Sequence, residues 1–169
     1  MAKSDSLDDW TPPMSGNATH RFRNTSVLTV QTADASQVIT SDALDEQLAA
    51  TYRRVGLRPG MLERLAGIRE RRWWADGVTF VDGAAMAGAK AISESGVDPA
   101  SIGLMINTSV SRKHLEPSTA VAVHSALGLP RSAQNFDVTN ACLGFVNGME
   151  LAAAMIDSGM IDHALIVNG

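Results

Sequence analysis

The stretch FDVTNACLGFVNGM, residues 136–149, holds the only cysteine of this 169-residue sequence. Cys142 lies between an extended apolar run and a helix-like segment, so we expect it in the first turn of a helix directly after a strand. Free backbone N–H groups and the helix dipole favour a thiolate there, and the same N–H groups can donate to an acyl oxyanion. Cys142 is therefore a candidate nucleophile for acyl transfer. The alternative is a small core residue, the commonest role of a lone cysteine.

A second candidate for chemistry is Glu116, in the stretch HLEPSTA. If Pro117 is the first helical residue, Glu116 occupies the N-cap, where Ser, Thr, Asp or Asn would be favoured. This unfavourable choice suggests a role other than capping. A carboxylate that has lost water is a stronger base and can remove a proton from carbon. We interpret Glu116 as a general base, with an exposed loop acid as the alternative.

The elements that must position these residues alternate between strand and helix along the chain. Strands are predicted at residues 26–32, 102–108, 133–138 and 162–169, and helices at 41–55, 79–96, 117–128 and 141–159. Gly and Pro punctuation and the order of charges set these limits. Alternating strands and helices predict an α/β fold, a mostly parallel sheet with helices on both faces.

The helix predicted at residues 141–159 is apolar around nearly all of its circumference. Such a helix is typically buried on all sides, which a single layer of sheet cannot achieve. Gly144, Gly148 and Ala152 follow one another at intervals of four, and this small-residue stripe allows another backbone to approach closely. We therefore expect part of the domain's apolar surface to lie bare or to be covered by another polypeptide.

Composition narrows the class of protein. Hydrophobic residues make up 45% and charged residues 19%, which is typical of a globular domain. The net charge of −4 and the pI of about 5.5 argue against nucleic-acid binding. One cysteine excludes an internal disulfide framework, and no apolar run reaches the ~18 residues of a membrane span. We predict a cytoplasmic protein with a flexible tail at residues 1–20 and one domain at residues 21–169.

Three stretches together resemble the N-terminal half of a thiolase-superfamily condensing enzyme of the type III ketoacyl synthase kind. They are residues 67–74 (GIRERRWW), 106–120 (INTSVSRKHLEPSTA) and 135–169, around Cys142. The glutamate in HLEPSTA is similar to that of the OleA branch, which joins two fatty acyl-CoA molecules head to head for long-chain olefin synthesis. The resemblance covers about residues 22–169. It implies two similar halves, each with a five-stranded sheet, in a homodimer whose buried central helix follows Cys142.

The resemblance also implies a reaction, a ping-pong Claisen condensation. Cys142 would take an acyl group from a fatty acyl-CoA, and a second acyl-CoA would attack it through its α-carbon. In the OleA branch the product is released as a β-keto acid. Glu116 would act across the dimer, as the base that removes the α-proton inside the neighbour's acyl tunnel. No metal and no permanently bound cofactor is expected, since acyl-CoA is the substrate.

Two features of the family are missing from this sequence. The catalytic His and Asn belong to the second half, and none of the histidines here matches their motif: His20, His114, His124 and His163. The sequence also stops at the family's fourth strand, so we expect the chain to need a C-terminal half and to be inactive alone. Met61 and Leu65 stand where bacterial type III synthases have the Trp and Arg that enclose the CoA adenine, so no CoA-binding residue is assigned.

Two other functions remain open. One is a decarboxylating β-ketoacyl-ACP synthase III of fatty-acid synthesis, and the other is a non-catalytic partner subunit built on half of the fold. Decarboxylation generates its own carbanion, and synthases of that kind usually have a bulky apolar residue at the position of Glu116. A retained Cys142 together with Glu116 favours the non-decarboxylating acyltransferase.

Overall fold

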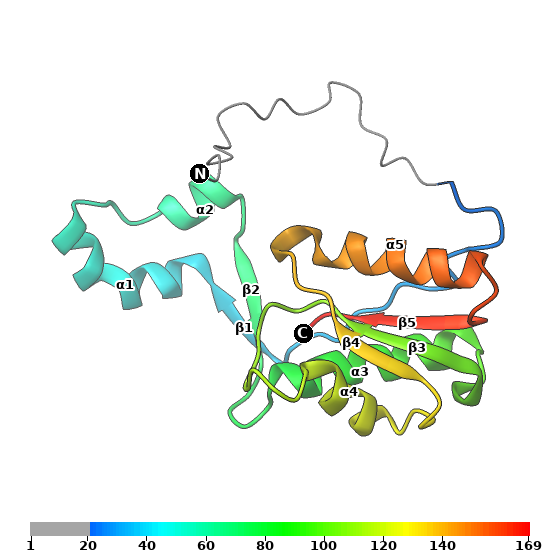
Figure 1. Ribbon diagram of the computed structural model, residues 1–169. Coiled ribbons are helices and arrows are strands. Elements are labelled where there is room, and N and C mark those ends of the chain that lie inside the picture. Colours follow the sequence, from blue (N-terminus) through cyan, green and yellow to red (C-terminus); the bar gives the residue numbers. More distant parts are fainter. Residues whose placement is uncertain (1–20) are drawn as a thin grey trace, which may run out of the picture.

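The larger part of the molecule is a parallel sheet flanked by helices, as the computed structural model of residues 21–169 shows (Figure 1). Its strands are β3 (Ile102–Asn107), β4 (Gln134–Asp137) and β5 (His163–Val167), in the spatial order β4-β3-β5. The central strand β3 pairs in parallel with both neighbours. Parallel neighbours need crossover connections, and helices supply them here. The α/β architecture expected from the sequence is confirmed.

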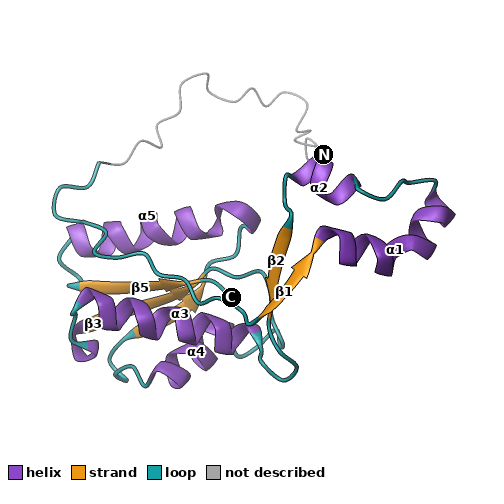
Figure 2. Cartoon of the chain, turned by 180° about the vertical axis from the view of Figure 1, so that it is seen from behind, coloured by secondary structure: helices purple, strands orange, loops and turns teal. Residues whose placement is uncertain are grey.

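Helices cover both faces of this sheet. α5 (Gly144–Asp157) lies on one face, while α3 (Phe80–Ser95) and α4 (Thr119–Leu127) lie on the other (Figures 1 and 2). Two short 3-10 turns, η2 (Pro99–Ser101) and η3 (Ala141–Leu143), precede β3 and α5. The polypeptide therefore passes from β4 in the sheet to α5 on one of its faces through the η3 turn, which contains the cysteine.

The centre of the core is β3, whose successive residues serve opposite faces of the sheet. Leu104, Met105 and Ile106 are all 0% exposed. Met105 packs into the cluster shared with α3 and α4, which includes Ala84, Ala120 and Val123. Leu104 and Ile106 pack into a second cluster, with Ala152 of α5. A strand buried on both faces reads as a continuous apolar run, which explains why IGLMIN was recognised from sequence.

A smaller lobe extends to one side of the sheet (Figure 1). It consists of β1 (Gln37–Thr40) and β2 (Glu70–Trp73), which pair in an antiparallel ribbon, together with α1 (Ser41–Val55) and α2 (Met61–Ala66). Of these four elements, only α1 was predicted from the sequence. Each of the strands is four residues long, too short for a period-two pattern to stand out.

The limits of α1 and α3 agree with the sequence because their signals are local. Thr40 caps α1 by accepting a hydrogen bond from Ala43 N, and Gly56 ends it in the left-handed region. Thr79 and Asp82 form a reciprocal capping box at the start of α3, and Gly96 ends that helix. Caps of this kind satisfy backbone N–H groups that have no partner inside the helix.

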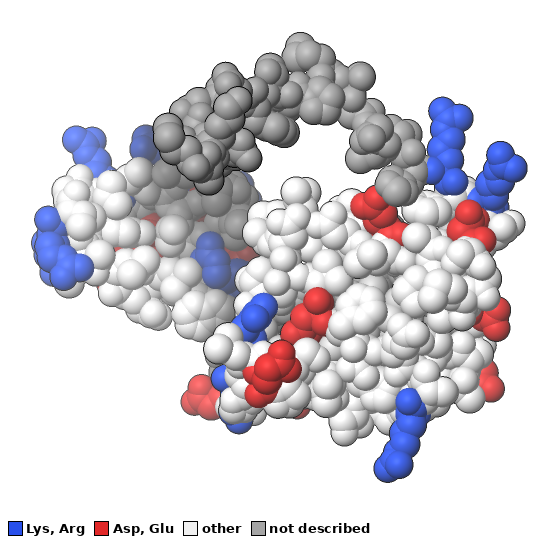
Figure 3. Space-filling view, viewed as in Figure 1, with Lys and Arg blue, Asp and Glu red and all other residues white. Residues whose placement is uncertain are grey.

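The small-residue stripe of α5 meets the sheet of the same chain, so the close backbone neighbour that the stripe allows belongs to this chain, and the apolar surface expected to lie bare or covered is on other sides of the helix. A Cβ on Gly148 would lie 2.9 Å from Thr108 Cγ2, and one on Gly144 would lie 3.0 Å from the Thr108 carbonyl oxygen. Few charged side chains interrupt the surface of the α/β body in the view of Figure 3. The helix is not buried all round in this chain, because four large apolar residues of α5 are exposed: Phe145, Val146, Met149 and Leu151.

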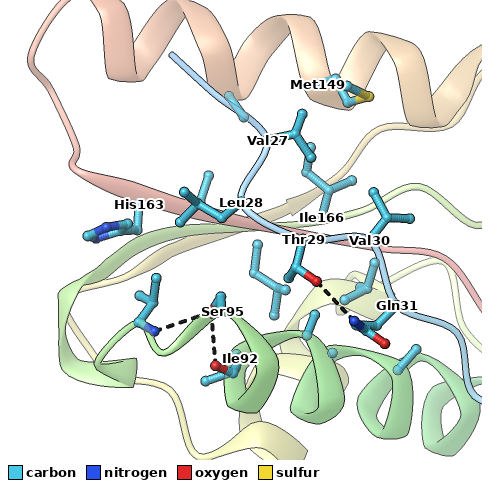
Figure 4. Close-up of a pocket in the computed structure, with 18 of the residues that line it drawn as sticks. Val27, Leu28, Thr29, Val30, Gln31, Ile92, Ser95, Met149, His163 and Ile166 are labelled. Atoms are coloured by element: carbon cyan, nitrogen blue, oxygen red, sulfur yellow. Dashed lines mark hydrogen bonds between the residues drawn. The ribbon is translucent and has the colours of Figure 1, made fainter. Parts of the chain in front are cut away.

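Residues 26–32, predicted as a strand, are extended but belong to no strand ladder among residues 21–169. They form one wall of a cavity of about 740 Å³, with β5 as the opposite wall and with α3 and α5 on the remaining sides. Figure 4 shows this segment passing between Met149 of α5 and Ile92 of α3. The residue types are those of a strand, so what the segment lacks is a neighbouring strand to pair with.

The tail predicted for residues 1–20 lies outside the described residues. Three contacts fix the start of the described chain. Asp157 Oδ1 accepts hydrogen bonds from Arg23 N at 2.9 Å and Asn24 N at 2.8 Å, and Thr25 Oγ1 donates to Ala153 O at 3.2 Å. Within residues 21–169, no helix combines the length and the apolar character needed to cross a membrane.

Candidate active site

The candidate residues gather at the carboxyl edge of the sheet. Because β3, β4 and β5 are parallel, their last residues lie together at one edge, where α/β proteins commonly bind ligands. Asn107 of β3 is directly opposite Asp137 of β4 and Val167 of β5. The loop after β3 carries Glu116, and the loop after β4 carries Cys142.

Cys142 lies in the η3 turn, immediately before α5. Ala141, just before it, has a φ of 44°, a conformation uncommon for a residue with a side chain. Neither η3 nor α5 has a side-chain N-cap, although the N–H groups of Leu143 and Gly144 already donate to the carbonyl oxygens of Asn140 and Ala141. A negative charge near the positive end of the α5 helix dipole is favoured, and this applies equally to a thiolate and to an acyl oxyanion.

The Cys142 side chain is exposed. The acyl tunnel that the resemblance implies is not closed over this sulfur by residues 21–169 alone. The neighbouring Leu143, 59% exposed, and Phe145, 41% exposed, are apolar side chains open to solvent. Exposed apolar side chains close in sequence to a thiol suit a fatty acyl group.

Glu116 is exposed in the loop between β3 and α4. Its predicted place at the N-cap is wrong: α4 begins at Thr119, the N-cap is Ser118, and Pro117 precedes the helix. The reason for suspecting Glu116 from its capping position therefore falls away. What remains is an exposed carboxylate beside Leu115, which is itself 82% exposed. In the part of the chain that the structure describes, no hydrogen bond or ion pair involves Glu116.

Two side chains tie the loops of the candidate residues together. Arg112 Nη2 of the Glu116 loop donates to Thr139 Oγ1 of the Cys142 loop, at 3.4 Å. Asp137, at the end of β4, accepts backbone hydrogen bonds from the first residues of α4. The structure joins the two loops in this way, but it records no direct contact between the side chains of Cys142 and Glu116.

The sequence did not reveal the polar residues that surround this edge. Asn107, Thr108 and Ser109 are 0–4% exposed at the end of β3. Thr108 Oγ1 donates to Val167 O at 3.0 Å, and Ser109 Oγ donates to Gly169 O at 2.5 Å. The available signal was the switch from the apolar run IGLMI to the polar run NTS, which marks the end of the apolar strand.

Residues 21–169 contain no cluster of His, Cys, Asp or Glu side chains suited to a metal ion. That no cofactor is permanently bound stays a prediction. Met61 and Leu65, which resemblance places at the CoA adenine, both lie on α2 in the small lobe. Leu65 is 73% exposed, so the side chain is available to a ligand or to another part of the protein.

Comparison with known proteins supports the same kind of site. A family model described as 3-oxoacyl-[acyl-carrier-protein] synthase III matches residues 136–169, the stretch that contains Cys142. A curated relative from Xanthomonas campestris, named acyl-CoA:acyl-CoA alkyltransferase, is 45% identical over 148 residues, which are 88% of this chain and 44% of the relative. A relative of the same name from Shewanella oneidensis is 39% identical over 134 residues, which are 79% of this chain and 38% of the relative.

Solved structures also match the fold of this chain closely. A solved structure of Xanthomonas campestris OleA, with serine in place of one cysteine, contains bound lauric acid and lauroyl-CoA. It superposes with a TM-score of 0.81 and 44% identity over 88% of this chain and 44% of that chain. This chain thus spans less than half the length of the curated relatives it matches.

Proposed function

Since this chain is similar over 88% of its length to an acyl-CoA:acyl-CoA alkyltransferase and matches a type III synthase model around Cys142, we propose that it is the nucleophile-bearing part of an acyltransferase that joins two fatty acyl-CoA molecules. The observation that carries the proposal is the place of Cys142: an exposed thiol in the turn between a parallel strand and the uncapped N-terminus of α5. Similarity to alkyltransferases over 88% of the chain indicates the substrate class.

In the first half of the proposed reaction, the Cys142 thiolate attacks the thioester carbon of an acyl-CoA. The carbonyl electrons move to oxygen, where the positive end of the α5 helix dipole stabilises the oxyanion. The carbonyl then re-forms, the bond to the CoA sulfur breaks, and CoA leaves as a thiol after taking up a proton. The acyl group remains on Cys142, beside the apolar side chains of Leu143 and Phe145.

In the second half, the Glu116 carboxylate of the neighbouring subunit removes a proton from the α-carbon of a second acyl-CoA. The resulting carbanion attacks the acyl group on Cys142, and the cysteine sulfur leaves. A β-ketoacyl-CoA results, and hydrolysis of its thioester gives a β-keto acid, the first product on a route to long-chain olefins. Acyl-CoA enters only as substrate, and no resident cofactor takes part.

The proposed enzyme requires a C-terminal half and a second copy. The C-terminal half would supply the catalytic His and Asn, and it would cover the exposed apolar side of α5. A further strand would fill the cavity between β5 and residues 26–32, where two extended segments face each other without pairing. A homodimer would bring Glu116 of one chain to Cys142 of the other. We also propose a cytoplasmic location for this assembly.

A decarboxylating β-ketoacyl-ACP synthase III is the second candidate, because the family model that matches residues 136–169 carries that description. The two candidates differ in their need for a base. Decarboxylation leaves the carbanion behind when CO₂ departs, so that reaction does not need Glu116 to remove a proton.

The test uses the full-length enzyme and separates the two half-reactions. Glu116→Gln should still allow acylation of Cys142 but should block formation of the carbon–carbon bond, while Cys142→Ser should block both. In mixed dimers, a Cys142→Ser subunit with intact Glu116 should restore condensation to a Glu116→Gln subunit. Condensation of two acyl-CoA molecules at the wild-type rate by Glu116→Gln would contradict the proposal, and condensation only with a malonyl thioester would favour the decarboxylating synthase.

A further inference from the structure

α4 begins without a side-chain cap of its own. Its N-cap, Ser118, makes no side-chain hydrogen bond to the helix, although serine is a favoured residue at that position. The acceptors come instead from Asp137 on β4: Oδ2 accepts from Thr119 N at 2.9 Å, and Oδ1 accepts from Ala120 N at 2.8 Å. A residue 18 positions further along the chain than Thr119 therefore caps this helix.

Asp137 is itself held in place by its cross-strand neighbour. Asn107, 0% exposed, lies opposite it in the register and donates from Nδ2 to Asp137 Oδ1 at 3.0 Å. The Asn107 Oδ1 atom in turn accepts a hydrogen bond from Ser109 N at 3.4 Å. The carboxylate thus receives three hydrogen bonds, and the polar residues at the end of β3 fix its orientation.

The end of β4 and the start of α4, which Asp137 links, differ in how firmly other contacts hold them. β4 pairs with β3 over four residues, so its end remains in place without the Asp137 side chain. The first N–H groups of α4 have no other side-chain acceptor, and Glu116 lies only three residues before Thr119. Loss of the carboxylate therefore acts on α4 and the Glu116 loop rather than on the strand that leads to Cys142.

We infer that Asp137 is a positioning residue for carbon–carbon bond formation: its carboxylate fixes the start of α4, and with it the Glu116 loop, against the end of β4. This inference rests on the proposed function, because it assigns to Asp137 a role in the step that Glu116 performs. It does not make Asp137 a catalytic residue, since Asp137 acts on the reaction through the position of Glu116.

The variant Asp137→Asn tests the inference in the full-length enzyme. The amide retains one oxygen and turns an NH₂ group toward the helix, so one of the two helix N–H groups loses its acceptor and faces a donor instead. Hydrogen exchange at Thr119 and Ala120 should become about tenfold faster, as expected for loss of a helix N-cap. The rate of condensation should fall by about tenfold or more, which corresponds to the free energy of one lost helix cap. The rate of Cys142 acylation should stay within about twofold of wild type.

Asp157→Asn is the matched control, because Asp157 also accepts two backbone hydrogen bonds from a distant segment, at Arg23 and Asn24. It lies at the opposite end of α5 from the cysteine turn. Exchange should quicken at Arg23 and Asn24 in this variant, and both half-reactions should keep wild-type rates. If Asp157→Asn lowers condensation as much as Asp137→Asn does, the loss reflects a general destabilisation of the fold, and the inference is overturned.

A second variant distinguishes positioning of the Glu116 loop from simple capping of α4. The same variant can be assayed if Asp137→Asn alone fails to fold. Ser118→Asp in the Asp137→Asn background gives α4 a local cap without the link to β4. Protection of Thr119 and Ala120 should return while condensation stays low. Return of full condensation would show that Asp137 only caps the helix, which overturns the inference.

The inference and the proposed function fail in different ways. If Cys142→Ser retains condensation, the proposed function is wrong whatever Asp137 does. If Cys142→Ser and Glu116→Gln behave as proposed but Asp137→Asn condenses at the wild-type rate, only the inference is overturned.

Discussion

Replacement of Gly148 by alanine tests how closely α5 packs on the sheet. Gly148 is in the interior of the helix, where alanine normally stabilises by about 1 kcal/mol relative to glycine. Here the new Cβ would lie 2.9 Å from Thr108 Cγ2, 3.4 Å from Ile166 Cγ2 and 3.5 Å from Ile106 Cγ2. The first distance is too short for two carbon atoms in contact, so either the helix or Thr108 must move.

Thr108 has little freedom to move. Its side chain is 2% exposed, and its Oγ1 donates to Val167 O at 3.0 Å, which fixes the direction of the methyl group. Overpacking of a tight site costs about 1–3 kcal/mol, which exceeds the gain in helix propensity. We expect Gly148→Ala to lower the free energy of unfolding by about 1 kcal/mol, and the melting temperature by about 2–4 °C.

Thermal and denaturant unfolding of a double-mutant cycle would measure this. Thr108→Ser removes the methyl group but keeps the hydroxyl that bonds Val167 O, so Gly148→Ala should be tolerated in the Thr108→Ser background. The coupling energy should be about 1 kcal/mol or more. Ala154→Gly, at an exposed position of α5, is the control and should show only the loss of helix propensity. The reasoning is refuted if Gly148→Ala raises the melting temperature while Thr108 is intact.

Two further predictions concern hydrogen bonds to carboxylates. Backbone hydrogen bonds from Asn24 and Arg23 lower the pKa of Asp157, so this contact stabilises the fold at neutral pH and is lost as the pH falls below about 4. Acid should therefore reduce exchange protection at Arg23 and Asn24 in the wild type, and an equal acid response in Asp157→Asn would contradict this. The hydrogen bond from the Tyr52 hydroxyl to buried Asp45, at 2.7 Å, raises the pKa of Tyr52, the only tyrosine. Asp45→Asn should return the phenol absorbance titration toward its ordinary value and lower the melting temperature; an unchanged titration would refute the assignment.

Most of the fold could be predicted because its signals are local. The limits of α1 and α3 follow from caps within a few residues of each end, and β3 is a continuous apolar run between turn residues. The start of α4 was misplaced by two residues because its cap comes from Asp137, on another element. Residues 26–32 have the composition of a strand, but strand pairing depends on a neighbour that the sequence pattern cannot show.

The same distinction applies to the site. Cys142 could be singled out from its residue type and its place between a strand and a helix. Glu116 was singled out partly through a capping argument that proved wrong, so its proposed role rests on resemblance and on an exposed loop at the same sheet edge. Asn107 and Asp137 were missed because an amide and a carboxylate on separate strands acquire meaning only when the register places them opposite each other.

The most direct test of the account is the intact mass of the full-length enzyme after brief incubation with lauroyl-CoA, the thioester bound in the solved relative. The account predicts one lauroyl group per chain, located on Cys142 by peptide mapping, released by hydroxylamine and absent from Cys142→Ala. Glu116→Gln should accumulate the same adduct, because its acyl group is not consumed. An enzyme that condenses acyl-CoA while Cys142 remains unmodified, or while Cys142→Ala keeps its activity, would contradict the central claim.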